Sequence, residues 1–220
     1  MNWQGVATAC RGGWIRALLR DLFKRVLDIA ASACALIVLS PLLVLIAVAE
    51  LWFHGWPPVF TQIRPGMGGK AFRLIKFRSM TNERGADGEL LPDADRLTAF
   101  GRKLRSSSLD ELPEFWNVLR GQMSLVGPRP LLMRYLERYT PEQAKRHDVR
   151  PGISGWAAVN GRNAASWEDR FAMDTWYVEN RTTRLDLLIL LKTVRTVLIR
   201  EGVSHAGHET MPEFMGSAGT

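Results

Sequence analysis

Cysteine is scarce in this chain of 220 residues, which has only Cys10 and Cys34. Two cysteines do not form the disulfide framework of a small secreted domain. The nucleotide-binding patterns GxGxxG and Walker A are absent, as are the HExxH zinc-protease and GxSxG hydrolase patterns. No internal repeat indicates a solenoid or a propeller. These absences exclude several common enzyme classes and leave a single-domain or slightly larger protein.

The composition describes a folded, basic protein. Hydrophobic residues make up 46% of the chain and charged residues 23%, which excludes an intrinsically disordered chain. The length is sufficient for a hydrophobic core without disulfides or metals. The formal net charge of +7 indicates anionic partners such as phosphates, nucleic acid or anionic lipid.

One uncharged and mostly apolar run, from Ile29 to Ala49, is long enough to cross a membrane. As a straight helix it would be about 31 Å long at about 1.5 Å per residue. Pro41 predicts a kink because it lacks a backbone donor, and Ser40 can bond to the freed carbonyl. Both flanks of the run are basic, so the positive-inside rule places both on the cytoplasmic side. A re-entrant hairpin satisfies this rule and a spanning helix does not, although the length allows either.

The remaining patterns predict mostly helices with a small antiparallel β element. Alternating residues predict strands over 59–63 and 71–80, which a glycine-rich turn joins into a hairpin. Ser108 to Glu111 has the pattern of a capping box at a helix start. Further helices are predicted over 113–120, about 131–139, 167–180 and 183–200.

The adjacent carboxylates Asp110 and Glu111 have two interpretations. Acids in the first turn of a helix complement its dipole, so both residues can be purely structural. Alternatively, an aspartate can attack phosphorus to form an acyl phosphate, and a neighbouring glutamate can accept a proton. Two neighbouring carboxylates also suit Mg²⁺, which often shares its ligand shell with substrate phosphates.

Basic side chains accompany this acid pair in the sequence. Pro128 and Pro130 restrict the backbone around Arg129, whose guanidinium fork matches phosphate oxygens. Lys76 and Arg105 add positive charge, although each can equally be a solvated surface cation. Two further acids stay open at this point: Asp186 suits a helix cap, and Asp174 has no clear role.

Several motifs occur in an order that resembles one known family. They are Lys24-Arg25-Val-Leu-Asp28, Ser40-Pro41, Arg64-Pro-Gly66, Lys76-Phe77-Arg78-Ser-Met80, Leu104-Arg105-Ser-Ser-Ser-Leu-Asp110-Glu111-Leu-Pro113, Met123-Ser-Leu-Val-Gly-Pro128-Arg129-Pro130, Arg150-Pro-Gly-Ile-Ser-Gly155 and Asn160-Gly-Arg-Asn163. The chain resembles the monotopic phosphoglycosyl transferases, also called bacterial sugar transferases. The small PglC-type enzymes, which initiate N-linked protein glycosylation, are the most similar. The resemblance covers about residues 22–212.

The resemblance implies a reaction and its participants. A sugar 1-phosphate would pass from a UDP-sugar to polyprenyl (undecaprenyl) phosphate, with release of UMP and a requirement for Mg²⁺. Asp110 would be the nucleophile that forms a covalent phosphosugar intermediate, which predicts ping-pong kinetics. Glu111 would be the general base, or would hold Mg²⁺ together with Asp110. Phosphate binding would fall to Arg129, Lys76, Arg105 and Arg162.

The resemblance also implies an organisation on the membrane. The helix broken at Ser40-Pro41 would be re-entrant, and amphipathic helices would lie at the interface. A monotopic enzyme of the bacterial inner membrane is expected, with its catalytic domain on the cytoplasmic face. The predicted segments are a basic N-terminal extension (1–21), the re-entrant helix (22–53), a compact catalytic domain (54–202) and a C-terminal tail (203–220).

Two rival functions fit parts of the sequence. A membrane-anchored glycosyltransferase would release UDP, but it usually has a nucleotide-binding α/β domain, and no alternating strand–helix pattern occurs here. A non-catalytic basic anchor would bind anionic lipid or nucleic acid and would tolerate loss of the Asp110 carboxylate. The phosphoglycosyl transferase interpretation needs membrane lipid and no nucleic acid.

Overall fold

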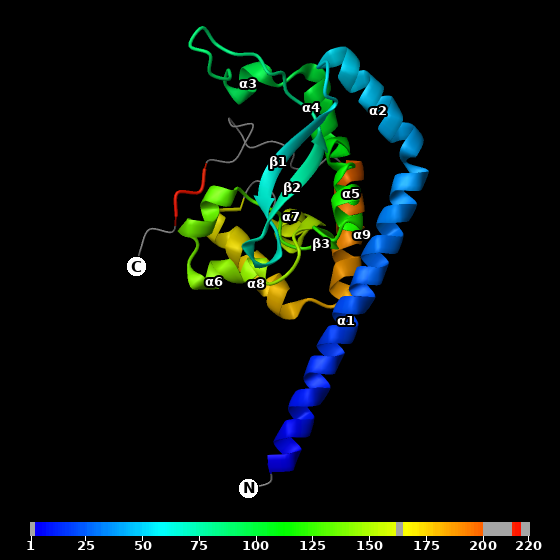
Figure 1. The fold of residues 1–220 in the computed structure, drawn as a ribbon, viewed down its shortest axis with the longest axis vertical. Helices are drawn as coiled ribbons and strands as arrows, with labels where there is room; N and C mark the ends of the chain where they lie inside the picture. The colour runs from blue at the N-terminus through cyan, green and yellow to red at the C-terminus, as the bar shows by residue number, and fades with distance from the viewer. Residues whose placement is uncertain (1–2, 162–164, 200–212, 217–220) are drawn as a thin grey trace.

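A computed structural model describes residues 3–161, 165–199 and 213–216 of the chain, and Figure 1 shows its arrangement. The helices are α1 (Trp3–Val38), α2 (Ser40–Phe53), α3 (Asp93–Arg96), α4 (Ala99–Ser106), α5 (Glu114–Leu119), α6 (Pro141–Ala144), α7 (Trp156–Asn160), α8 (Trp167–Asn180) and α9 (Thr183–Ile199). Short 3₁₀ turns are η1 (Met67–Gly69), η2 (Leu109–Glu111), η3 (Met133–Arg138) and η4 (Lys145–His147). The predicted mostly helical composition is confirmed.

The long first helix bends sharply where the sequence predicts a kink. Leu18–Val38 and Ser40–Phe53 meet at 63°. Pro41 has no backbone N–H to donate to the carbonyl of Ile37, four residues earlier. The Ser40 hydroxyl donates to that carbonyl instead, at 2.7 Å. The bend is therefore built from local chemistry, as expected for a proline kink with serine compensation.

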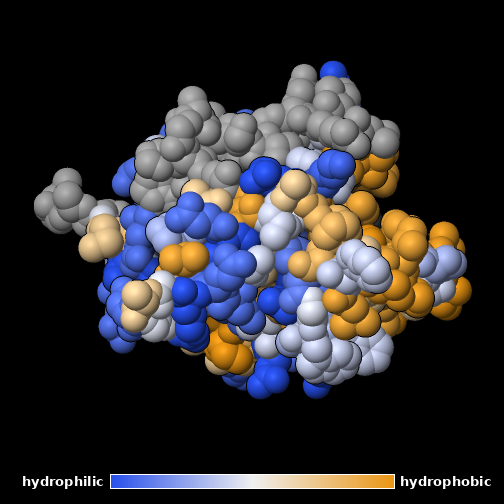
Figure 2. Space-filling view, turned by 90° about the horizontal axis from the view of Figure 1, so that it is seen from above, coloured by the Kyte–Doolittle hydropathy of each residue, from blue (hydrophilic) through white to orange (hydrophobic). Residues whose placement is uncertain are grey.

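The described helices include no single one that is both long and apolar enough to cross a membrane, but the bent α1–α2 pair passes that test as a unit. Large apolar side chains project outward from it. Figure 2 shows hydrophobic residues gathered on the right of the molecule, the side that carries α2 in Figure 1. The exposed apolar residues of this pair include Leu22, Phe23, Val26, Ile37, Val38, Val44, Leu45, Val48 and Trp52.

A β-hairpin forms the centre of the domain, as predicted. Its strands β1 (Val59–Pro65) and β2 (Ala71–Phe77) pair antiparallel, from Val59 opposite Phe77 to Pro65 opposite Ala71. Phe72 and Leu74 face inward onto Val118 and Met123 and form a core cluster with α5. The alternation places Lys76 near the end of β2, where this strand passes the 3₁₀ turn η2.

A second pair of strands was not predicted. β3 (Ser124–Val126) and β4 (Gly152–Ser154) pair in parallel, in a region that the sequence pattern assigns partly to loops. A Cβ atom at Gly152 would lie 2.1 Å from the backbone nitrogen of Gly127, so only glycine fits there. Backbone bonds from Gly127 N to Ser154 O and from Gly152 N to Pro128 O fix the chain next to Arg129.

Ion pairs join the first helix to the last two. Arg181 donates to both carboxylate oxygens of Asp21, at 3.0 and 3.1 Å, and Lys24 donates to Asp186 at 2.8 Å. The Tyr177 hydroxyl donates to the same Asp186 at 2.6 Å. The predicted helix-cap role of Asp186 is therefore wrong: the Thr182 hydroxyl accepts from Leu185 N in that position, and Asp186 links α9 to α1.

Candidate active site

The acid pair lies on a tight turn between two helices. Asp110 and Glu111 belong to η2, and α4 and α5 flank this turn. The predicted capping box is wrong, because Ser108 has φ +56° and its side chain accepts no capping hydrogen bond. The Glu111 side chain bonds to Arg129 and Lys76, which are distant in sequence, and such charged partners outcompete a local cap.

The left-handed backbone of Ser108 leads to a prediction about stability. A side chain at positive φ costs about 1–2 kcal/mol, and a β-branched side chain costs most. Ser108→Gly should keep or slightly raise the free energy of unfolding, and Ser108→Val should lower it by about 1–2 kcal/mol. Denaturant unfolding in detergent measures both changes. Equal stability of the two variants would contradict this interpretation of the turn.

Four charged side chains meet at the turn. The Lys76 ammonium donates to Glu111 Oε1 at 2.7 Å, and the Arg129 guanidinium donates to the same oxygen. Asp110 is 8% exposed, and its carboxylate accepts no hydrogen bond from any described residue. The Glu111 carboxylate is therefore held by two cations, whereas the Asp110 carboxylate is available for contact with a substrate.

The electrostatics separate the two acids. Burial, together with the adjacent Glu111 charge, raises the pKa of Asp110 to about 6. Burial opposes ionisation of Glu111 too, but the positive charges of Arg129 and Lys76 outweigh it and lower the pKa of Glu111 to about 2. The more basic carboxylate is the better nucleophile, so this arrangement favours Asp110 for that role.

A third carboxylate, Glu114, belongs to the same cluster and was missed in the sequence. It begins α5, is 3% exposed, and its Oε1 lies 3.0 Å from the Lys76 Nζ. Burial raises the pKa of Glu114 to about 7 despite this lysine. Asn117, one turn later, donates to Arg73 O and accepts from Ile75 N, which fixes α5 against β2. The spacing of three residues from Glu111 is a signal that could have revealed Glu114.

The loop that carries Arg129 is held from behind by a buried ion pair. Pro128 and Pro130 are buried, whereas the Arg129 side chain is half-exposed and reaches Glu111. The Arg146 guanidinium donates to the Arg129 carbonyl at 2.8 Å and to Asp174 Oδ2 at 2.7 Å. Asp174, whose role the sequence left open, thus orients Arg146, and Arg146 in turn holds the backbone of Arg129.

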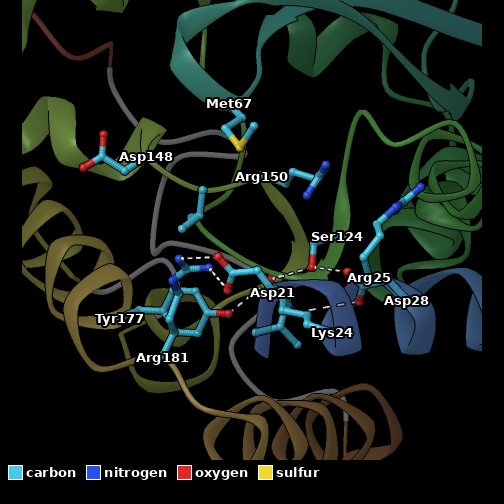
Figure 3. Close-up of a pocket in the computed structure, with 12 residues that line it drawn as sticks. Asp21, Lys24, Arg25, Asp28, Met67, Ser124, Asp148, Arg150, Tyr177 and Arg181 are labelled. Carbon is cyan, nitrogen blue, oxygen red and sulfur yellow. Dashed lines mark hydrogen bonds and ion pairs between the residues drawn. The ribbon is translucent and has the colours of Figure 1, made fainter. Parts of the chain in front are cut away.

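The other predicted basic residues lie differently. Arg105, on α4, donates to the Ser79 hydroxyl at 2.8 Å and is close enough to Asp110 to lower its pKa. Arg162 lies outside the described residues. The cavity in Figure 3 is a separate place: Asp21, Lys24, Asp28 and Arg181 line it, and these charges pair with one another or with neighbouring groups. We regard that cavity as part of the joint between α1 and α8.

The carboxylates at this turn are suitable ligands for Mg²⁺, but they are too few to fill its coordination shell. The available ligands are carboxylate oxygens, which this hard cation prefers. Within the part of the chain that the structure describes, no group of three or more acidic, histidine or cysteine side chains is arranged to hold a metal ion. One or two protein carboxylates would therefore bind the ion, with phosphate oxygens and water completing its shell.

Comparison with known proteins identifies the family to which this chain belongs. The sequence profile described as "Bacterial sugar transferase" matches residues 19–200. The chain belongs to this bacterial sugar transferase family. The predicted resemblance is confirmed, and with it the prediction of an enzyme, a phosphoglycosyl transferase, rather than a non-catalytic anchor.

Individual relatives agree with this family. The chain is 53% identical over 197 residues to a Bacillus subtilis protein named "Uncharacterized sugar transferase EpsL", covering 89% of this chain and 97% of that one. It is 40% identical to the UDP-glucose:undecaprenyl-phosphate glucose-1-phosphate transferase of Caulobacter vibrioides, over 85% of this chain and 74% of the relative. It is also 40% identical to the undecaprenyl-phosphate galactose phosphotransferase of Salmonella typhimurium, over 81% of this chain but only 41% of that longer protein.

Proposed function

We propose that this enzyme transfers a sugar 1-phosphate from a UDP-sugar to polyprenyl phosphate, of which undecaprenyl phosphate is the bacterial form, and releases UMP. It would catalyse the first membrane step of bacterial glycoconjugate assembly. The observation that carries the proposal is the Asp110 carboxylate, which is buried, unbonded by other described residues and surrounded by Lys76, Arg105 and Arg129. The names of the Caulobacter and Salmonella relatives support the choice of donor and acceptor.

The proposed reaction has two displacements at one phosphorus atom. An Asp110 oxygen attacks the β-phosphorus of the donor, the bond to the UMP oxygen breaks, and UMP leaves. An oxygen of the lipid phosphate then attacks the same phosphorus, the acyl phosphate bond breaks, and Asp110 is regenerated. Arg129 and Lys76 keep the pKa of Glu111 low, so Glu111 would accept the proton of the lipid phosphate only after substrate phosphates have displaced it from these cations.

The basic residues explain how anions can meet at this turn. Donor and acceptor both carry phosphates, so repulsion must be offset by fixed positive charge. Arg129 and Lys76 supply it at the open side of the site, and Arg105 supplies it near Asp110. Mg²⁺ held by Asp110 or Glu111 would neutralise further phosphate charge.

The membrane arrangement is part of the proposal. The 63° bend, the exposed apolar side chains of α1 and α2, and the basic flanks support a re-entrant helix on the cytoplasmic face of the bacterial inner membrane. Such a monotopic anchor would hold the acid pair at the depth of the lipid phosphate.

The identity of the released nucleotide tests the reaction. Detergent-solubilised protein would be incubated with Mg²⁺, undecaprenyl phosphate and a panel of UDP-sugars. We expect UMP with at least one donor, together with a phosphosugar adduct by intact mass when the acceptor is omitted. UDP as the released nucleotide would show simple glycosyl transfer and would contradict the proposal.

The proline kink provides a prediction about topology. Ser40→Ala combined with Pro41→Leu restores a backbone donor to the Ile37 carbonyl, so the helix should straighten and span the membrane. In a Cys34→Ser background, we expect an impermeant maleimide applied to spheroplasts to leave Cys10 unlabelled in the parent and to label it in the straightened variant. Leu45→Ala, on the exposed face of α2, is the matched control. Labelling of Cys10 in the parent would contradict the re-entrant arrangement.

A further inference from the structure

Lys76 lies between two carboxylates that differ in their access to solvent. Its ammonium is 2.7 Å from Glu111 Oε1 and 3.0 Å from Glu114 Oε1. The Glu111 side chain is 15% exposed and the Glu114 side chain only 4%. Glu111 therefore faces the open side of the site, and Glu114 faces the interior.

This asymmetry decides which carboxylate a substrate can replace. A phosphate that enters from solvent can compete with Glu111 for Lys76 and for Arg129, because both cations donate to the accessible Glu111 oxygen. It cannot reach the contact between Lys76 and Glu114, which is buried against the hairpin. The Glu114 backbone is held in place by α5, and Asn117 bonds this helix to β2, the strand that carries Lys76.

We propose that Glu114 is a positioning residue that holds the Lys76 ammonium at the site while Glu111 yields to the donor phosphate. The inference rests on the proposed function, because it assigns Lys76 to phosphate binding. A lysine side chain has four rotatable bonds, and without a fixed second partner it would follow whichever anion is nearest. With Glu114 in place, the ammonium presents its remaining N–H to the substrate from a defined point.

The charge of Glu114 has a second consequence. When ionised, its carboxylate cancels part of the positive potential that attracts the donor, and it acts on Arg129 and Arg64 as well as on Lys76. Because the pKa of Glu114 is about 7, this charge is nearly complete only above neutral pH. Glutamine retains the acceptor oxygen for Lys76 but removes the charge. At pH 8, where Glu114 is mostly ionised, Glu114→Gln should therefore keep kcat within about twofold and lower KM for the UDP-sugar by about three- to tenfold.

Removal of the side-chain oxygen that Lys76 contacts should instead lower kcat. Glu114→Ala leaves Lys76 without its interior partner, so kcat should fall by about tenfold or more. The discriminating result is this split: glutamine rescues kcat and improves KM, whereas alanine loses kcat. A merely structural residue would change kcat and KM in parallel with the melting temperature, without rescue of this kind.

The experiment uses the full-length chain with the donor that gives UMP release. Initial rates are measured at several salt concentrations, because the effect of Glu114→Gln on KM should shrink as salt screens the charge. Glu179→Gln is the matched control: it makes the same chemical change on α8, where Glu179 is half-exposed and pairs with Lys145. Melting temperatures of all variants identify any that do not fold.

The outcomes separate the inference from the function. If the parent releases UMP and both Glu114 variants match it, the positioning role is wrong and the function stands. Equal loss of kcat in Glu114→Gln and Glu114→Ala also overturns the inference, because it shows a need for the charge itself. If no UDP-sugar gives UMP with the parent, the proposed function fails; unchanged affinity for UMP in Glu114→Gln, measured by calorimetry, would then overturn the inference independently.

Discussion

Asp110→Asn should abolish UMP release, with a loss of at least about 10³-fold, equivalent to about 4 kcal/mol of transition-state stabilisation. An asparagine has the shape of the aspartate, but its amide lacks the carboxylate oxygen that attacks phosphorus, so it cannot form an acyl phosphate. The covalent adduct should disappear in the same variant. Initial rates and intact mass, measured on the same preparation, test both expectations.

The same substitution should leave the protein at least as stable. The pKa of Asp110 is raised from 3.8 to about 6, so the group is still mostly ionised at pH 7, but its ionisation costs more free energy in the folded protein than in the unfolded chain. This shift corresponds to about 3 kcal/mol of destabilisation by the charge, which asparagine removes. Asp95→Asn, at an exposed acid of α3, is the control and should change neither rate nor stability. Substantial turnover by Asp110→Asn would exclude the covalent mechanism.

Asp174→Asn should lower the free energy of unfolding by about 3–5 kcal/mol, the usual result when one member of a buried ion pair is removed. Asp174 and Arg146 are 6% and 2% exposed, so the arginine would keep a buried charge without its counter-ion. The melting temperature should fall by about 6–20 °C. Because Arg146 also bonds to the Arg129 carbonyl, UMP release should fall as well.

A double variant distinguishes the two effects. Asp174→Leu with Arg146→Met replaces the ion pair by apolar side chains, a change that is often neutral for stability. We expect most of the melting temperature to return while activity stays low, because Arg146→Met removes the side chain that donates to the Arg129 carbonyl. Full recovery of activity in this variant would show that Arg146 does not position Arg129.

The sequence predicted best where short-range chemistry decides the structure. The kink at Pro41 depends on one missing N–H and on one serine hydroxyl three residues from its acceptor. The hairpin depends on alternation and on glycines, of which Gly68 and Gly69 have positive φ. The β3–β4 pair was missed because each strand has only three residues and its partner lies almost 30 residues away, so no local sequence pattern predicts the pairing.

The sequence motifs predicted several residues of the candidate site, but not how these residues contact one another. The motifs supplied Asp110, Glu111, Arg129 and Lys76, and the structure brings these residues together. The capping box failed because the Glu111 carboxylate bonds to cations that only the tertiary fold brings near. For the same reason Arg146 could not be assigned from the sequence, and the role of Glu114 is identified only by its contact with Lys76.

The ion pairs between the first helix and the end of the chain join residues that are synthesised at different times. Asp21 and Lys24 are translated about 160 residues before their partners Arg181 and Asp186. The chain between Phe53, where α2 ends, and Arg181 is 128 residues long, so at about 5–20 residues per second the complete α1–α2 pair exists for about 6–26 seconds before the first of those partners is made. The proposed insertion of this helix pair into the bilayer can therefore be complete while the ribosome is still extending the chain. In the proposed arrangement, the nascent protein would be held at the membrane first and would assemble its active site there, beside the proposed lipid acceptor.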